Sequence, residues 1–369
     1  MRVFQDADFT LIAAVAILVC FGLVMVYTSS AVVIGEIKSD SLYYFKKQFI
    51  WTLLGLIFFT FFLITDYKKL QKFIIPFTII TFLLLLGVLL FGTPIRNARR
   101  WFTFSYFHFQ PSELAKFMLI LFIADYLDKN KSRLKYFSTG FLPPFLVTAG
   151  MAVLIALQPD LGIPVIMMIS AIFLFFIGGG KITHIMFIIA LGIPALIYEL
   201  RSHPYRLDRL KSFIEPWKYY SDGHSYQLVQ SLTSLGSGGI LGKGAGASEI
   251  SRFYIPDAHT DFIFTVIGEE FGVLGAVSVL ILFCIILQRG YTISKHSRDN
   301  FGTLLAAGIT LIITIQAFFN IAVCTGCLPT KGLTLPFVSY GGSSIFFNLC
   351  AAGILANISA NGRKVIKLR

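Results

Sequence analysis

The chain has 369 residues, of which 56% are hydrophobic and 14% are charged, and Phe alone occurs 38 times. A soluble protein of this size could not bury so much apolar surface, so lipid must be the solvent for most of the chain. The net charge of +12 fits membrane topology and anionic lipid better than a nucleic-acid partner, because no basic run is interleaved with aromatic residues.

Ten apolar segments are long enough, or nearly so, to cross a hydrocarbon core, which takes about 20 helical residues. Backbone groups in lipid must be satisfied within the segment, and this favours helices over strands. The predicted fold is therefore an all-α polytopic membrane protein that forms a single integral membrane domain over residues 1–369. The predicted spans are 9–31, 48–65, 73–92, 112–127, 141–157, 162–179, 183–200, 262–287, 302–323 and 343–360.

The distribution of Lys and Arg between the spans predicts the orientation of the chain. One side carries 16 of these residues, counted over the N-terminus, the connections 66–72, 128–140, 180–182 and 288–301, and the tail from 361, whereas the short segments on the other side carry seven. Because short cytoplasmic segments carry the excess of basic residues, both termini are expected in the cytoplasm. The long loop 201–261 is then expected outside.

The loop 201–261 contains a Gly-rich run from Gly236 to Gly246 that includes Lys243. The run is not a nucleotide-binding P-loop, which needs Gly five positions before the Gly-Lys pair and Ser or Thr after it. Two interpretations stay open. The run is either a flexible turn whose amides and Lys243 approach a phosphate or a glycan, or a purely structural bend.

Asp261 directly precedes the eighth span and follows His259. A helix N-terminus favours the ionised form of a carboxylate, and a carboxylate at the membrane surface is placed to accept a proton from a hydroxyl group. Asp is also a favoured N-cap residue, so its position alone leaves a catalytic base and a simple cap as alternatives. Glu269 and Glu270 lie two turns into the same span, where one of them could face the same cavity as Asp261.

Basic residues on the same predicted side suggest an anionic partner. Arg99 and Arg100 follow the third span, and Lys331 lies between the last two. They either anchor the helices at the interface or bind a diphosphate headgroup, for which Arg offers a bidentate fork and Lys a point charge. Glu113 and Lys116, within the fourth span, are spaced i, i+3 and are expected to pair and to face the interior or a wet cavity.

Six ordered motifs extend over essentially the whole chain. They are FQPSELAK at 109–116, QPDLG at 158–162, YQLVQS at 226–231, GSGG at 236–239, AHTDF at 258–262 and PTKGLTLPFVSYGGSS at 329–344. With these motifs the chain resembles the SEDS family, the bacterial shape, elongation, division and sporulation proteins. The pieces SELAK, YQLVQ and TKGLTLP resemble the division members more than the elongation members, and the sporulation members remain an alternative.

The resemblance implies a ten-helix lipid II polymerase in the bacterial cytoplasmic membrane, at the division septum. Such proteins join disaccharide-pentapeptide units carried on undecaprenyl diphosphate into glycan strands outside the membrane. The implied partners are lipid II, a class B penicillin-binding protein transpeptidase and other divisome membrane proteins, with no nucleic acid.

The resemblance also implies roles for particular residues. The essential acidic residue of the family corresponds to Asp261, which is thereby expected to be the catalytic base. The expected substrate-binding residues are Lys331, Arg99, Arg100, Trp101, Glu113, Lys116, His259, Gln227, Gln230, Lys243 and Ser339.

In the implied reaction, Asp261 takes the proton from the 4-hydroxyl of the acceptor sugar, which attacks the anomeric carbon of the donor with inversion. Lipid diphosphate leaves, and Lys331 and the two arginines stabilise the charge. A divalent cation could assist, but no clear carboxylate cluster for one appears in the sequence, and no other cofactor is predicted.

Two other functions are weighed against the polymerase. A lipid II flippase would also need intramembrane charges and a basic patch, but transporters often show internal symmetry between halves, which this sequence lacks. A non-enzymatic scaffold for the transpeptidase would not need Asp261, Lys331 and the arginines on one side.

Overall fold

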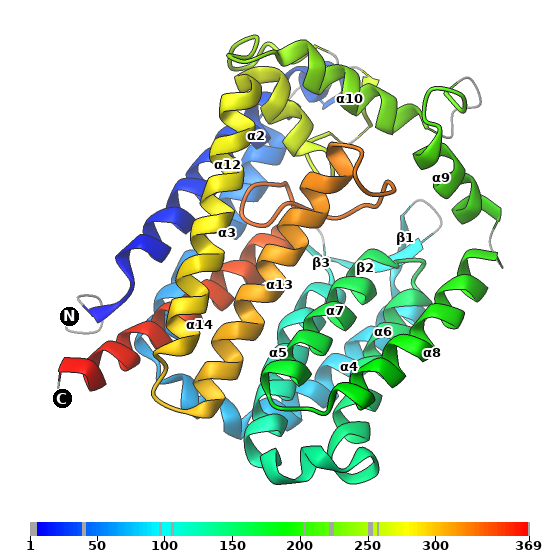
Figure 1. Ribbon diagram of the computed structural model, residues 1–369. Helices are drawn as coiled ribbons and strands as arrows, with labels where there is room; N and C mark the ends of the chain where they lie inside the picture. Colours follow the sequence, from blue (N-terminus) through cyan, green and yellow to red (C-terminus); the bar gives the residue numbers. More distant parts are fainter. Residues whose placement is uncertain are drawn as a thin grey trace.

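The computed structural model describes residues 6–38, 42–95, 98–104, 107–201, 204–220, 225–249, 254–256 and 258–367. Long helices run beside one another through the molecule, and the shorter helices α9 (Pro204–Ile214) and α10 (Tyr226–Gly238) gather at one end (Figure 1). The start of the chain lies against the last helix, since the Asp8 amide donates a 2.9 Å hydrogen bond to the Ser359 hydroxyl.

Each of the ten predicted spans corresponds to a helix. Seven of these helices are long and apolar enough to cross a membrane, by length and composition, and α7 and α8 contain shorter apolar stretches. The helices are α2 (Phe9–Lys38), α3 (Tyr43–Ile64), α4 (Ile74–Phe91), α5 (Pro111–Lys129), α6 (Leu142–Ala156), α7 (Gly162–Ile177), α8 (Ile182–Arg201), α12 (Ile263–Lys295), α13 (Asn300–Cys324) and α14 (Gly342–Lys367).

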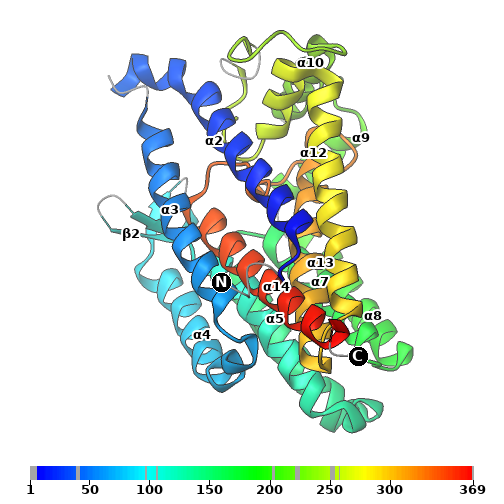
Figure 2. The same ribbon diagram turned by 90° about the vertical axis from the view of Figure 1, so that its left-hand side faces the viewer.

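The last two helices form the centre of the bundle. Of the 18 most apolar consecutive residues in each helix, 89% are buried in α14 and 72% in α13, but only 22% in α3. Figure 2 shows α14, in red, running obliquely below α2 and beside α3. A helix surrounded by protein can carry polar side chains, so α13 and α14 are the places where buried polar groups are expected to have a specific use.

A small sheet, which the sequence did not predict, is added to the predicted helical membrane fold. The connection between α4 and α5 forms three antiparallel strands in the order β1-β2-β3, namely β1 (Thr93–Ile95), β2 (Ala98–Phe104) and β3 (Phe107–Phe109). The strands are rich in aromatic and β-branched residues, which favour a pleated, half-buried surface. The sequence prediction missed the sheet because these strands are shorter than a membrane span.

Helix α12 is interrupted by a kink at Gly272, whose φ of 65° and ψ of −162° are not helical. The amides after the kink turn to the Gly-rich run instead of their own helix. Val273 N donates to Gly239 O over 3.0 Å, and Leu274 N donates to Ile240 O over 3.3 Å. Before the kink, the Lys243 and Gly244 amides donate to Glu269 O and Glu270 O. Both sides of the kink are therefore attached to the segment that follows α10.

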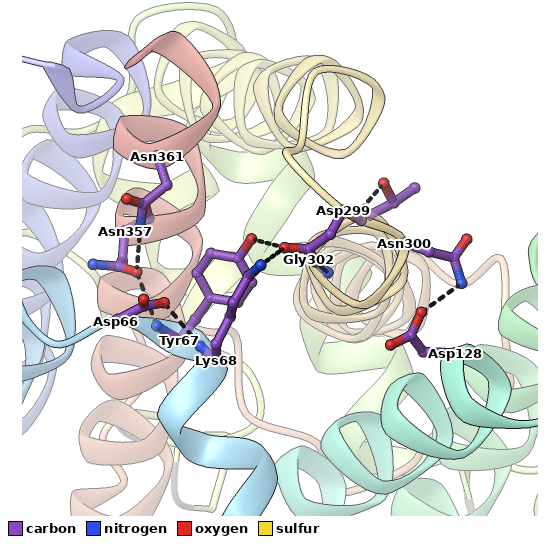
Figure 3. A network of polar contacts seen from close by, with 10 residues as sticks. Asp66, Tyr67, Lys68, Asp128, Asp299, Asn300, Gly302, Asn357 and Asn361 are labelled. Carbon is purple, nitrogen blue, oxygen red and sulfur yellow. Dashed lines mark hydrogen bonds and ion pairs between the residues drawn. The ribbon is translucent and has the colours of Figure 1, made fainter. Parts of the chain in front are cut away.

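A polar network joins four segments at the end of α13 where that helix begins (Figure 3). The Asp299 carboxylate accepts a hydrogen bond from Tyr67 OH at 2.7 Å and lies 2.8 Å from Lys68 Nζ. Asn300 Nδ2 donates to Asp128 Oδ1 of α5 over 3.1 Å, and Tyr67 N donates to Asn357 Oδ1 of α14 over 3.2 Å. The network holds together the start of α13, the end of α5 and part of α14, at the opposite end of α13 from Asp261.

Candidate active site

Asp261 lies in the turn that leads into α12. Phe262 is the N-cap residue of that helix and Asp261 precedes it, which disfavours the interpretation of Asp261 as a simple cap. The Asp261 side chain lies against the loop between α13 and α14, because a Cβ built at Gly332 would be 2.8 Å from Asp261 Oδ2. The structure thus brings Asp261 directly beside the residue that follows Lys331.

The contact between Asp261 and Gly332 lies at the surface of the protein. Asp261 and Lys331 are half-buried, and Gly332 is exposed. In Figure 1 the loop that carries Lys331 is drawn in orange, at the end of the molecule where α10 lies. A carboxylate and an ammonium-bearing residue therefore share a partly exposed surface.

Two hydrogen bonds hold the turn before α12 to the loop, and a third holds it to α13. Ser339 Oγ donates to Thr260 O over 2.6 Å, and Tyr340 N donates to His259 O over 2.9 Å. The third bond comes from Asn320 on α13, whose Nδ2 donates to Asp261 O over 2.8 Å. Ser339 also accepts a bond from Leu335 N at 2.7 Å, so its hydroxyl is engaged within the loop.

The His259 ring is part of an aromatic cluster. Its centroid lies 4.4 Å from that of Tyr44 and 5.5 Å from that of Tyr340, and the two tyrosine rings are 4.7 Å apart. Burial, and to a smaller extent the neighbouring tyrosines, raises the pKa of Tyr340. Its phenol therefore stays protonated beside the His259 ring.

Glu113 and Lys116 pair as their spacing predicts, with 2.8 Å between Lys116 Nζ and Glu113 Oε2. Both are buried, at 4% and 0% exposure. Lys116 Nζ also donates to Gln316 Oε1, and Gln316 Nε2 donates to Thr334 O over 2.8 Å. Through Gln316 the pair is thus connected to the loop between α13 and α14.

The predicted arginines bind backbone carbonyls at helix ends. Arg99 is exposed, and its Nη1 donates to Leu90 O over 2.9 Å. Arg100 Nε donates to Gln158 O over 2.9 Å, and its Nη2 donates to Pro159 O. For Arg99 and Arg100 these bonds favour the anchoring alternative over the diphosphate alternative.

Arg100 is nevertheless linked to the loop between α13 and α14, because the turn that it binds contacts that loop. That turn leads into Gly162, where a Cβ would be 2.8 Å from a methyl carbon of Leu333. Trp101 stands in β2 opposite Thr93, whose hydroxyl donates to Trp101 O over 3.3 Å. The turn from Gln158 to Gly162 thus connects the sheet, through Arg100, to Leu333 of the loop.

Lys243 and the Gly-rich run pack on α12. Lys243 Nζ lies 2.9 Å from Glu269 Oε1, and Ser248 Oγ donates to Glu270 Oε1 over 2.7 Å. A Cβ at Gly242 would be 2.2 Å from Glu270 O. These contacts favour the structural bend, and they place both glutamates against this run rather than against Asp261.

The two predicted glutamines lie on α10. Gln230 Nε2 donates to Tyr220 OH over 2.9 Å, and Gln227 is half-buried. Within the described ranges, no group of three or more His, Cys, Asp or Glu side chains could hold a metal ion.

Sequence reasoning missed three residues of this site. Asn320 and Gln316 each donate to the loop between α13 and α14, and Arg209 of α9 donates to Thr330 O over 3.2 Å. A signal was available for the two amides, because Gln316 and Asn320 are polar residues spaced i, i+4 within an otherwise apolar span. Side-chain amides inside a membrane span face protein rather than lipid.

Comparison with known proteins identifies one family over nearly the whole chain. The family described as "Cell cycle protein", which covers FtsW, RodA and SpoVE, matches residues 9–364. A "Probable peptidoglycan glycosyltransferase FtsW" from Geobacter sp. (strain M18) is 38% identical over 365 residues, 98% of this chain and 99% of that protein. "Stage V sporulation protein E" from Bacillus subtilis (strain 168) is 36% identical over 358 residues, 96% of this chain and 98% of that protein.

Solved structures share the fold. A chain from a structure described as "Structural coordination of polymerization and crosslinking by a peptidoglycan synthase complex" has a TM-score of 0.79 and 28% identity, covering 96% of this chain and 98% of that one. The rod shape determining protein RodA of Thermus thermophilus has a TM-score of 0.70 and 27% identity, covering 96% of each chain. From its sequence motifs, its fold and these relatives, this chain belongs to the cell cycle protein family of FtsW, RodA and SpoVE, the SEDS family.

Proposed function

We propose that this chain is a peptidoglycan glycosyltransferase that polymerises lipid II into glycan strands, for septal wall synthesis in cell division. The observation that carries the proposal is the Asp261 carboxylate lying on Gly332, next to Lys331, on a partly exposed surface. A base and a cation side by side are the groups that sugar transfer from a diphosphate carrier requires. The full-length relatives named as probable peptidoglycan glycosyltransferases support the same function.

In the proposed reaction, Asp261 accepts the proton of the 4-hydroxyl of the acceptor sugar while that oxygen bonds to the anomeric carbon of the donor. The bond from the anomeric carbon to the diphosphate oxygen breaks, and its electron pair leaves with undecaprenyl diphosphate. Attack from the opposite face converts an α-linked donor to a β-linkage without a covalent intermediate. Lys331 stabilises the charge that develops on the leaving group.

The reaction takes place at the outer face of the cytoplasmic membrane. Both termini and the Asp299 network lie on the cytoplasmic side in this proposal, because the basic residues of the short connections are concentrated there. The loop 201–261 and Asp261 lie outside. We further propose a class B penicillin-binding protein transpeptidase as the partner, and the similarity to a chain of a peptidoglycan synthase complex supports it.

A lipid II polymerisation assay with the purified protein and its transpeptidase partner tests the proposal. Wild type, Asp261→Asn and the control Asp208→Asn are compared, and the glycan products are resolved on a gel. Asp208 is a partly exposed carboxylate of the same loop that pairs with Lys211 at 3.6 Å. We expect strands from wild type and from Asp208→Asn, and none from a folded, partner-bound Asp261→Asn.

Equal product from Asp261→Asn and wild type would remove Asp261 as the base. Product from none of the three proteins, with the partner demonstrably bound, would contradict the polymerase and favour transport or scaffolding.

A further inference from the structure

We infer that Asn320 is a positioning residue for the reaction proposed above, because its carboxamide joins the turn that carries Asp261 to the loop that carries Lys331. Asn320 lies on the last turns of α13 and is 1% exposed. Its Nδ2 donates to Asp261 O over 2.8 Å and to Leu333 O over 2.6 Å. The inference rests on the proposed function and adds a residue that touches neither substrate.

The chemistry of the amide suits this task. A carboxamide nitrogen carries two hydrogens, and here each points to one backbone carbonyl. One side chain thereby satisfies two carbonyls from distant parts of the sequence. An aliphatic side chain of similar volume, such as leucine, would fill the space but leave both carbonyls without this donor.

The two bonds determine where the Asp261 carboxylate lies. One bond fixes the backbone of Asp261 itself, and the other fixes Leu333, the neighbour of Gly332. The carboxylate lies on Gly332, where a Cβ would be 2.8 Å from Oδ2. Loss of the Asn320 bonds would let the turn and the loop shift relative to each other, and a misplacement of about 1 Å can cost on the order of 10²-fold in rate.

Other bonds keep the loop in place when Asn320 is changed. Gln316, one turn earlier on α13, donates to Thr334 O over 2.8 Å. Ser339 Oγ still donates to Thr260 O. An Asn320 variant is therefore expected to fold with the loop attached and with the Asp261 turn less restrained.

The experiment measures kcat and KM for lipid II in the polymerisation assay, with the partner present, together with the melting temperature. The variants are Asn320→Leu and Gly332→Ala, and the control is Thr314→Val. Thr314 is buried on the same helix, and its hydroxyl donates to Thr310 O, away from the loop. Gly332→Ala displaces the carboxylate from its other side at an exposed position.

We expect kcat to fall on the order of 10²-fold for Asn320→Leu, with KM changed by about twofold or less. Gly332→Ala should lower kcat in the same way, and Thr314→Val should keep the wild-type kcat. A wild-type kcat for folded Asn320→Leu, or a raised KM with unchanged kcat, would overturn the inference. If Asn320→Leu does not fold, Gly332→Ala decides, because a wild-type kcat there also overturns it.

Asp261→Asn, measured in the same series, separates this inference from the proposed function. If Asp261→Asn is active, the proposed base is wrong. If Asp261→Asn is inactive while Asn320→Leu keeps the wild-type kcat, the positioning role of Asn320 alone is wrong.

Discussion

Replacing Lys116 alone should destabilise the protein more than replacing both members of its ion pair. Lys116 Nζ lies 2.8 Å from Glu113 Oε2 and also donates to Gln316. Both charged groups are buried, with Lys116 at 0% and Glu113 at 4% exposure. Lys116→Met therefore leaves a buried carboxylate without its cation.

The magnitude follows from that burial. Removal of one partner from a buried pair costs about 3–5 kcal/mol, whereas replacement of both by neutral groups is often nearly neutral. The double variant Glu113→Gln/Lys116→Met still loses the hydrogen bond to Gln316, which is worth about 1 kcal/mol. We therefore expect the double variant to be more stable than Lys116→Met by about 2 kcal/mol or more.

The assay is equilibrium unfolding in detergent micelles, with the free energy of unfolding measured for each single variant and for the double. Lys218→Met is the control, since Lys218 and Glu215, which pair at 2.7 Å, are 67% and 52% exposed. An exposed pair is worth about 1 kcal/mol or less. The reasoning is refuted if Lys116→Met costs no more than this control, or if the two single losses add in the double variant.

Two further predictions concern other parts of the molecule. Gly242→Ala should lower the thermal midpoint more than Gly244→Ala: both glycines have positive φ, 83° and 107°, but a Cβ at Gly242 would be 2.2 Å from Glu270 O, whereas a Cβ at Gly244 would have nothing within 4 Å. Equal midpoints would contradict this reading of the contact. The second prediction is that Asp299→Asn should matter less in acid. Burial works to raise the pKa of Asp299, but hydrogen bonds from Lys68 and two other donors lower it overall, so its stabilisation is present above the unfolded pKa of about 3.9 and is lost as pH falls through the folded pKa. The midpoint difference between wild type and Asp299→Asn should stay constant from pH 7 to about pH 4 and shrink below that, and a difference that grows on acidification would count against it.

The spans could be predicted because each is specified by a local run of apolar residues. The pairing of Glu113 with Lys116 is local too, since i, i+3 neighbours on a helix always lie on one side. The family was also recognised from motifs in the sequence, and the comparisons confirm it. The small sheet was missed because strands of three to seven residues produce no hydropathy signal on the scale of a span.

The arrangement of the site depends on contacts between distant segments, which spacing does not specify. Nothing in the sequence places Asp261 on Gly332, or shows that Asn320 binds both segments. The Gly-rich run was left between two interpretations, and the structure favours the bend because Lys243 reaches Glu269. The substrate roles of Lys243 and the other predicted binding residues stay predictions.

The kink at Gly272 has a consequence for the way motion would pass along α12. The part from Val273 to Lys295 would rise roughly 35 Å, which is enough to cross a hydrocarbon core of about 30 Å without the first turns. Those first turns, from Ile263 to Phe271, follow Asp261 directly, and their Glu269 and Glu270 carbonyls accept hydrogen bonds from the Lys243 and Gly244 amides of the Gly-rich run. The Val273 and Leu274 amides at the start of the long part bond to the same run. A tilt of the long part would therefore pull on the Gly-rich run as well as on the turns that follow Asp261.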